Sequence, residues 1–267
     1  MQHKLLLALV VLYEMKLKHS DTIISLQAQS KRLDKLVIWD NSQVGQEISD
    51  LGFRDTKVQY IHTPENVSLA KVYNTVVREN KFGGITLLDQ DSILPSNFIE
   101  EMSDMMEANT EVDLFLPIVK NKGIIMSPGQ FFLVKGSRWK NERMGLLKSK
   151  GVTAVTSGMT IRESYLKTDF EGFDERLTLY GIDTHFMIQF SKKRKDLFVA
   201  NLQIQHDSAL NSKEDPDKLL YRWRNLKASW KIIHEKSLLL LFLSQLYAIY
   251  KSIMYAIKLK DIRFIKN

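Results

Sequence analysis

The chain has 267 residues, of which 44% are hydrophobic and 26% charged, so neither wholesale disorder nor a polytopic membrane protein is expected. It contains no cysteine, which excludes disulfides and thiolate metal sites. The formal net charge of +7 is concentrated toward the C-terminus, where apolar residues are interleaved with basic ones. We therefore expect a membrane surface, and no nucleic acid, as the anionic partner.

Residues 3–13 are predicted to form the first strand. A basic residue precedes the apolar run at residues 5–12, as in a signal peptide, but Tyr13, Glu14 and Lys16 follow it without a small-residue cleavage site. We therefore expect a buried strand and a cytoplasmic protein, which the lack of cysteine also fits.

Strands and helices alternate over the next hundred residues. Strands are expected at residues 35–39, 58–62 and 85–89, and helices at residues 22–33, 68–79 and 97–108. Ser20 and Asp21 supply the N-cap of the first of these helices. The alternation predicts an α/β fold built from βαβ units, with a largely parallel sheet that binds its ligands at the carboxyl ends of the strands.

The following stretch is less regular. We expect a strand at residues 112–119, loops and short hairpins at 120–150, a short strand at 153–158, a helix opening at 161–166, a helix at 184–190 and a strand at 197–205. Phe186, Met187 and Phe190 are predicted to lie in the core rather than against a cofactor.

From Pro216 onward the chain becomes helical, basic and aromatic. We place a boundary there, between a catalytic domain of residues 1–215 and a basic amphipathic extension of residues 216–267. Polar residues recur every seven positions along one side of the last helix, at Ser237, Ser244, Lys251 and Lys258. They argue against a lone transmembrane span and favour a helix that lies on a membrane surface or docks on its own domain or a second subunit.

The segment Ile85-Thr86-Leu87-Leu88-Asp89-Gln90-Asp91-Ser92 is an apolar strand that leads directly into two carboxylates. Because side chains alternate along a strand, Asp89 and Asp91 should point to one side and Gln90 to the other. Mg²⁺ and Mn²⁺ prefer carboxylate oxygens and commonly share them with phosphates, so a nucleotide diphosphate would suit this site. The alternative is a solvated acidic turn.

Asp40 and Asn66 also follow predicted strands, so we expect them to face the same crevice as the two acids.

The ordered motifs of the chain resemble those of family 2 glycosyltransferases of the GT-A fold, with rhamnosyltransferase-like members most similar. The motifs are Trp39-Asp40-Asn41-Ser42, Pro64-Glu65-Asn66-Val67-Ser68-Leu69-Ala70 with Asn74, Leu87-Leu88-Asp89-Gln90-Asp91-Ser92, Gly172-Phe173-Asp174-Glu175, Gly181-Ile182-Asp183 and Gln205-His206-Asp207. Together they span about residues 4–210. The match departs from the family at Ile182-Asp183, where many members carry Glu-Asp, and at Leu69-Ala70-Lys71, where many carry Gly-Ala-Arg.

The resemblance implies a GT-A nucleotide-diphosphate-sugar-binding domain. It implies an inverting, metal-dependent enzyme that moves a hexosyl or rhamnosyl group to a glycan or lipid-linked acceptor in surface polysaccharide synthesis. Mg²⁺ or Mn²⁺ would be the cofactor, and the protein would be peripheral on the inner face of a membrane. Its oligomeric state stays open, and a homo-oligomer is compatible with the sequence.

The resemblance also implies a role for individual residues. Asp183 is expected to be the catalytic base and Asp91 the direct metal ligand, with His206 as a further ligand or diphosphate contact. Asp89 would contact the ribose or the metal shell, and Asp40 the nucleobase or ribose. The remaining predicted donor contacts are Asn66, Asn74 and Gln90.

Several alternatives remain at this point. Phosphohydrolases of the haloacid dehalogenase type also use an Asp-x-Asp element, but on the first strand, whereas strands and helices precede Asp89 here. A non-catalytic nucleotide-sugar-binding protein would share the same donor site. Asp183 could instead be a helix N-cap, and His206 a hydrogen-bonded structural histidine.

Overall fold

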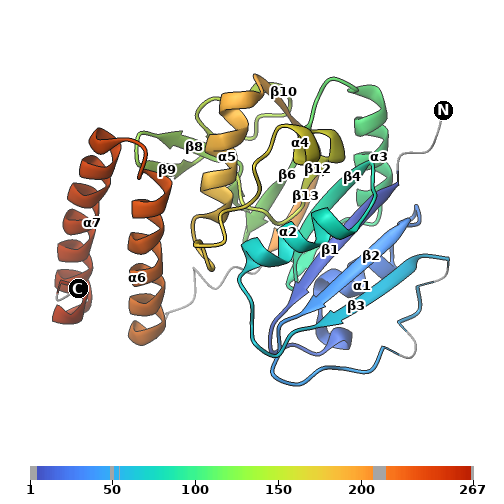
Figure 1. Cartoon of the computed structure of the whole chain (residues 1–267), viewed down its shortest axis with the longest axis horizontal. Helices are drawn as coiled ribbons and strands as arrows, with labels where there is room; N and C mark the ends of the chain where they lie inside the picture. Colours follow the sequence, from blue (N-terminus) through green and yellow to red (C-terminus); the bar gives the residue numbers. More distant parts are fainter. Residues whose placement is uncertain (1–4, 49–50, 54, 207–214, 266–267) are drawn as a thin grey trace.

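The computed structural model describes residues 5–48, 51–53, 55–206 and 215–265 (Figure 1). A central sheet is covered by helices, and two antiparallel C-terminal helices, α6 (Pro216–Ile233) and α7 (Leu238–Leu259), stand at one end of it. The expected α/β fold, with a mostly parallel central sheet and a C-terminal helical extension, is confirmed.

The first half of the sheet is entirely parallel, in the order β3-β2-β1-β4. Its strands are β1 (Leu6–Leu12), β2 (Lys35–Asp40), β3 (Lys57–His62) and β4 (Gly84–Asp89). Every residue of β1 is buried, because strands flank it and helices cover both faces. Helix α2 (Leu69–Glu79) packs on one face, and α1 (Asp21–Gln27) and α3 (Phe98–Ala108) pack on the other. Helix α1 is shorter than predicted.

The second half of the sheet is mixed. Its strands are β5 (Ser92–Ile93), β6 (Leu114–Asn121), β7 (Ile124–Ser127), β10 (Gly145–Lys148), β12 (Met159–Arg162) and β13 (Asp196–His206). Strand β12 runs antiparallel between β4 and β6, and β13 runs parallel to β6. A small second sheet joins β11 (Val152–Thr153), β8 (Gly129–Phe132) and β9 (Lys135–Arg138), so the short hairpins predicted at 120–150 are present.

The prediction of a strand at 153–158 is wrong, and the helix predicted to open at residue 161 begins two residues later. Residues 154–158 form a turn, β12 follows it, and α4 (Glu163–Thr168) begins only afterwards. Gly158 causes the difference, because it adopts a left-handed backbone with φ +81° and donates its N–H to the carbonyl of Leu87 at 2.7 Å. That bond ends the turn beside β4 and starts β12 against it.

Helix α5 (Ile182–Lys193) closes one face of the sheet. As predicted, Phe186, Met187 and Phe190 on this helix are buried. Phe186 stacks on Phe173, and Phe190 meets the ring of Tyr165 edge to face with 4.9 Å between the centroids. The aromatic cluster fixes α5, and the loop that leads into it, against the sheet.

Helices α6 and α7 form a hairpin with its own small core, followed by a short 3₁₀ turn at Ile262–Phe264. On α6 the core residues are Trp223 and Trp230, and the indole N–H of Trp223 donates to the Ser252 hydroxyl at 2.9 Å. The buried residues of α7 are small, namely Ser244, Ala248, Ser252 and Ala256. The half-buried rings of Tyr247 and Tyr255 beside them pack on Trp230 and Trp223 of α6. Most of the large apolar residues of α7 are left at the surface.

The close packing around Gly158 leads to a prediction about stability. A Cβ at this position would lie 2.4 Å from Cδ1 of Ile204 and 2.6 Å from Cγ of Pro117, on a backbone that side chains rarely adopt. Gly158→Ala is expected to lower the free energy of unfolding by about 3 kcal/mol or more. The control Gly123→Ala has a similar φ, +79°, with nothing within 4 Å of its Cβ, and should cost only about 1 kcal/mol. Equal costs in urea titrations would contradict this account.

Candidate functional site

The turn after β4 is held by hydroxyl groups at the start of α1. The Thr22 hydroxyl donates to the carbonyl of Asp89 at 2.5 Å and accepts the N–H of Ser92 at 2.9 Å. The Ser20 hydroxyl donates to the carbonyl of Gln90 at 2.7 Å. These bonds end the strand at Asp89 and fold the chain back, so that Asp91 lies in a turn and not on the strand.

Strand β5, which follows this turn, brings a distant residue to the site. It pairs antiparallel with the end of β13, so that His206 lies opposite Ser92. Nδ1 of His206 is 3.3 Å from a carboxylate oxygen of Asp91 and 3.4 Å from the Ser92 hydroxyl. The neighbouring Asp207, which is part of the predicted motif, lies outside the described residues.

Asp89, Asp91 and His206 form a cluster with the geometry of a cation site. Each offers one ligand atom, and these atoms all lie within 4.8 Å of one another. Two carboxylates and one imidazole suit Mg²⁺, Mn²⁺ or another divalent metal. The predicted metal ligands are thus brought together from the end of β4 and the end of β13.

The carboxyl group of Asp89 is strongly perturbed. The pKa of Asp89 is raised to about 6, chiefly by burial; His206 opposes the rise, and the carboxylates of Asp91 and Asp183 contribute to it. A hydrogen bond from Ser157 stabilises the charged form of Asp89. A bound cation would favour that charged form more strongly, because three carboxylates otherwise repel one another here.

Asp183 lies in the first turn of α5, within electrostatic range of Asp89. The alternative that Asp183 is the N-cap is wrong, because Gly181 takes that position with a left-handed φ of +85°. Oδ1 of Asp183 accepts the N–H of Thr184 at 2.7 Å. Burial raises the pKa of Asp183 above its ordinary value. A carboxylate with a raised pKa is a better proton acceptor, which suits a general base.

Three residues of the site did not emerge from the sequence. The Ser157 hydroxyl lies 2.6 Å from that of Ser92, and the Thr156 hydroxyl lies 3.4 Å from that of Tyr73. Burial, followed by the charge of Asp89, raises the pKa of Tyr73. The run Thr156-Ser157-Gly158 is typical of a turn, and that signal could have placed both hydroxyls beside Asp89.

Asp40 lies at the end of β2, two strands from Asp89. It is fully buried, and its carboxylate accepts the N–H of Ser42 at 3.0 Å, the hydroxyl of Tyr60 at 2.6 Å and the amide of Gln46 at 3.0 Å. Burial would raise the pKa of Asp40, but these hydrogen bonds together lower it. Its predicted contact with the donor stays a prediction.

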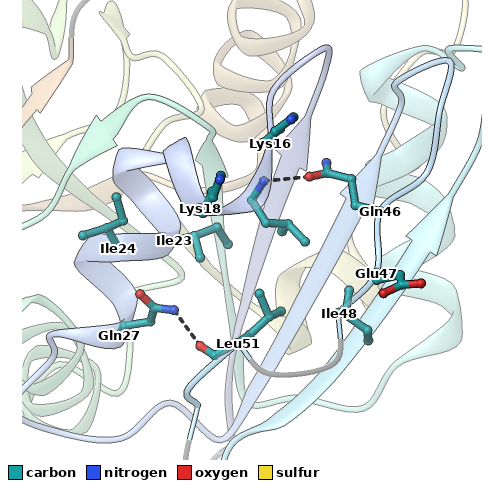
Figure 2. Close-up of a pocket in the computed structure, with 10 residues that line it drawn as sticks. Lys16, Lys18, Ile23, Ile24, Gln27, Gln46, Glu47, Ile48 and Leu51 are labelled. Atoms are coloured by element: carbon teal, nitrogen blue, oxygen red, sulfur yellow. Dashed lines mark hydrogen bonds between the residues drawn. The ribbon is translucent and has the colours of Figure 1, made fainter.

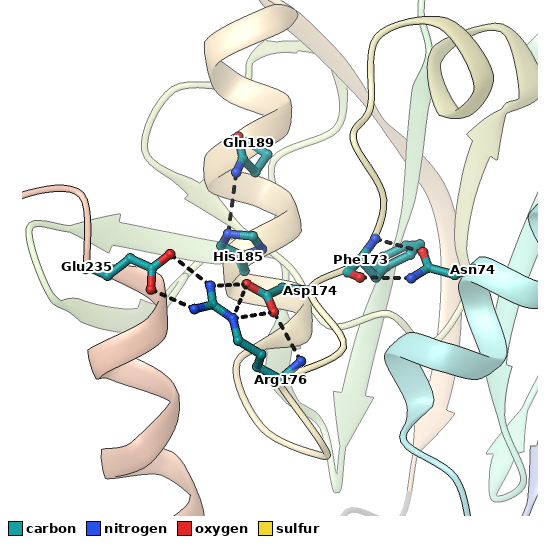
Figure 3. A network of polar contacts seen from close by, with 7 residues as sticks. All are labelled: Asn74, Phe173, Asp174, Arg176, His185, Gln189 and Glu235. Carbon is teal, nitrogen blue, oxygen red and sulfur yellow. Dashed lines mark hydrogen bonds and ion pairs between the residues drawn. The ribbon is translucent and has the colours of Figure 1, made fainter.

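The three other predicted donor contacts lie in different surroundings. Asn66 is exposed in the loop after β3, with φ +48°. The amide of Asn74 bonds to both the N–H and the carbonyl of Phe173, at 2.8 Å each (Figure 3). The Gln90 amide oxygen accepts the N–H of Tyr13 at 2.8 Å. Asn74 and Gln90 thus tie down loops next to the site.

A cavity of about 430 Å³ lies beside the ends of β1 and β2 (Figure 2). Gln46, which also bonds to Asp40, accepts the N–H of Leu17 at 2.9 Å in its wall. Lys16 and Lys18 add positive charge to its lining. Asp40 therefore organises one wall of this cavity through Gln46.

Comparison with known proteins identifies a family and a fold. The model of the family described as glycosyl transferase family 2 matches residues 20–170. No curated protein matches the chain. Similar solved structures include residues 1–349 of S. aureus TarS, with a TM-score of 0.57 and 11% identity over 98% of this chain and 89% of that one. GalNAc-T7, solved with UDP, GalNAc and Mn²⁺, has a TM-score of 0.59 and 8% identity over 77% of this chain.

These likenesses, at such low identity, concern the fold. A longer TarS structure has a TM-score of 0.52 and 12% identity over 85% of this chain. The present chain spans 40% of that longer TarS structure and 44% of GalNAc-T7. The predicted α/β architecture is thus shared with TarS and GalNAc-T7.

The raised pKa of Asp89 makes a prediction about stability without metal. The native state holds this proton up to about pH 6 and the unfolded chain only to about pH 4, so the free energy of unfolding should fall as pH rises through this window. Asp89→Asn should remove this fall with pH. Above pH 6 the free energy of unfolding of the variant should exceed that of the wild type by about 1 to 3 kcal/mol. Urea titrations at pH 5 and pH 7.5, with a chelator present to remove metal, test this prediction. The same pH dependence of stability in both proteins would contradict it.

Proposed function

This chain belongs to glycosyl transferase family 2, and we propose that it transfers a sugar from a nucleotide diphosphate donor to a glycan or lipid-linked acceptor. The observation that carries the proposal is the cluster of Asp89, Asp91 and His206 with Asp183 in electrostatic range. Structures of TarS solved with UDP and with UDP-GlcNAc, at 13% and 12% identity, support a nucleotide-sugar donor.

A divalent cation, Mg²⁺ or Mn²⁺, would be held by Asp91 and His206, with Asp89 beside them. When bound, it supplies Lewis-acid neutralisation of the negative charge on the leaving diphosphate. The donor set fits such an ion, and GalNAc-T7 was solved with Mn²⁺. The Ser157 hydroxyl orients Asp89, and the Ser92 hydroxyl links Ser157 to His206.

Asp183 is the proposed base. The acceptor oxygen forms a bond to the anomeric carbon as the bond from that carbon to the diphosphate oxygen breaks, and the acceptor proton passes to the Asp183 carboxylate. One displacement with one base inverts the anomeric centre. Such a base contributes about 10²- to 10⁴-fold to the rate, and the raised pKa of Asp183 favours proton uptake.

The remaining predicted residues divide into two groups. Asn66 is exposed, and we assign it direct contact with the donor. Asp40, Asn74 and Gln90 already use their side-chain polar atoms in bonds within the protein. We therefore propose that these three shape the donor site by holding the loops around it.

We also propose a place and a substrate class for the reaction. Residues 1–215 would form the catalytic domain, and residues 216–267 would keep the enzyme on the cytoplasmic face of a membrane. Lipid-linked acceptors of surface polysaccharide synthesis are found there. A hexosyl or rhamnosyl group is the proposed transferred sugar.

A donor screen with matched variants tests the function. Nucleotide diphosphate sugars are added with Mn²⁺ or Mg²⁺, and a donor that binds only the native state raises the melting temperature. Asp183→Asn should keep this rise but lose transfer by about 10²-fold or more. Asp91→Asn should lose both the metal-dependent rise and transfer. Full activity of Asp91→Asn would refute the metal assignment, and a protein stabilised by no donor would refute the proposed function.

A further inference from the structure

The outward face of α7 is apolar, and the residues that this helix buries are small. Ser244, Ala248, Ser252 and Ala256, spaced four apart, are the buried residues of this helix. They allow a close approach to α6, and the helix is 22 residues long. Most of its large side chains therefore point away from the protein.

We define the outer face of α7 by six residues that are between 43% and 70% exposed: Leu239, Phe242, Leu246, Ile249, Ile253 and Ile257. At 100° per residue they fall within an arc of about 80°. The outer face extends along nearly the whole helix. Soluble monomers rarely expose a contiguous apolar patch of this kind, which marks an interaction surface.

The charge of the hairpin indicates the partner. Residues 216–265 contain ten Lys and Arg and three Asp and Glu, an excess of seven positive charges that equals the net charge of the whole chain. None of the three acids lies in α7, and each pairs with an arginine: Asp217 and Asp261 with Arg263, and Glu235 with Arg176. An apolar face on a strongly basic hairpin is complementary to an anionic lipid surface.

We propose that the outer face of α7 lies in the headgroup region of an anionic bilayer, with the helix parallel to the membrane. This deepens the proposed function, because a lipid-linked acceptor would then be within reach, but the binding itself is testable alone. Helix α7 is long and apolar enough to span a membrane by length and composition. Its small-residue face, however, is held by α6, whose exposed Lys218, Arg224 and Lys231 would have to enter the hydrocarbon with it.

A second copy of the chain is the competing occupant of this face. Two hairpins that each carry seven excess positive charges would repel each other across a symmetric contact. An anionic membrane gains from the same charges. The observations therefore favour lipid.

Vesicle flotation tests this proposal independently of catalysis. The full chain should float with vesicles of phosphatidylcholine and phosphatidylglycerol, less so at high salt, and not with phosphatidylcholine alone. The double variant Leu239→Glu with Ile249→Glu should lose flotation and keep its melting temperature, because both side chains are exposed. The matched control Leu146→Glu changes an apolar residue that is 58% exposed on β10 and should float like the wild type.

Two results would overturn the proposal. One is flotation of the double variant equal to that of the wild type. The other is a wild-type protein that does not float with anionic vesicles and is a dimer by light scattering, while the double variant is a monomer. The outer face would then bind a second copy of the chain. Transfer to a water-soluble acceptor should be the same in the double variant and the wild type, so loss of transfer in all proteins would count against the proposed function alone.

A separate observation concerns Arg176, in the loop that leads to α5. Its guanidinium group bonds to the carboxylate of Asp174, at 2.6 to 3.2 Å, and to both carboxylate oxygens of Glu235, at 2.8 Å each (Figure 3). Asp174 belongs to the same loop, whereas Glu235 follows the end of α6. Arg176 therefore joins the C-terminal hairpin to the segment before Asp183.

A second contact supports the same connection. Gly181, the N-cap of α5, lies so close to α6 that a Cβ would be 2.8 Å from Cβ of Ser229 and 2.9 Å from Cδ1 of Ile233. Asp183 follows two residues later. The end of α6 thus backs the point where the catalytic helix begins.

We infer that Arg176 is a positioning residue, which fixes the loop of residues 174–181 to α6 and thereby sets the place of Asp183. The inference rests on the proposed function of Asp183. Because Arg176 is more than half exposed, its ion pairs should add little to stability, and its effect should appear in geometry. The hairpin is then part of the support of the site.

Arg176→Gln and a matched control test the inference. Arg263 makes the same kind of double ion pair, with Asp217 at 2.6 Å and Asp261 at 2.8 Å, but within the hairpin. Arg176→Gln should lower kcat about tenfold or more with little change in the donor KM, since misplacing a reacting group costs rate. Arg263→Gln should change neither kcat nor the donor KM.

Amide hydrogen exchange provides a readout that needs no activity. The amides of residues 181–185 should exchange faster in Arg176→Gln than in the wild type and in Arg263→Gln. Unchanged exchange at these residues, or an equal effect of the two variants on exchange and kcat, would overturn the inference. Lack of transfer by the wild type would count against the proposed function, with the exchange result still deciding the role of Arg176.

Discussion

The repulsion among three carboxylates at one edge of the sheet is the constraint on which the site depends. Asp89, Asp91 and Asp183 come from two distant parts of the chain, and burial raises the pKa of both Asp89 and Asp183. The Ser157 hydroxyl and the imidazole of His206 partly offset the negative charge of these carboxylates. A cation and the phosphates that it binds would complete the compensation, which is why the arrangement suits a nucleotide diphosphate donor.

The framework of the site was predictable because it depends on local patterns. Alternating strands and helices predicted the parallel sheet, and the strand that ends at Asp89 was evident from its apolar run. The proximity of His206 was not derivable from a local pattern, since it depends on the pairing of β5 with β13 over more than a hundred residues. There only the family resemblance suggested a role. The turn at Thr156 and Ser157 was missed because the left-handed backbone of Gly158 outweighed the strand propensity of the residues before it.

The C-terminal hairpin shows a different limit of sequence reasoning. Its periodicity predicted two faces but could not tell which of them the protein covers. The structure covers the small residues around Ser252, packs Tyr247 and Tyr255 on the tryptophans of α6, and leaves most of the large aliphatic residues outside. Through Arg176 and Gly181 the same hairpin also contacts the segment before α5. The hairpin therefore presents an apolar surface outward and contacts the start of α5 on its inner side.

The most direct test of the central claim is the position of the metal. Crystals of the protein grown with Mn²⁺ and a nucleoside diphosphate would be measured by anomalous diffraction at the manganese edge. The account predicts one peak within coordination distance of Asp91 and His206, with the diphosphate on its open side. A bound nucleotide with no manganese at these two residues, or a peak at another group of side chains, would contradict it.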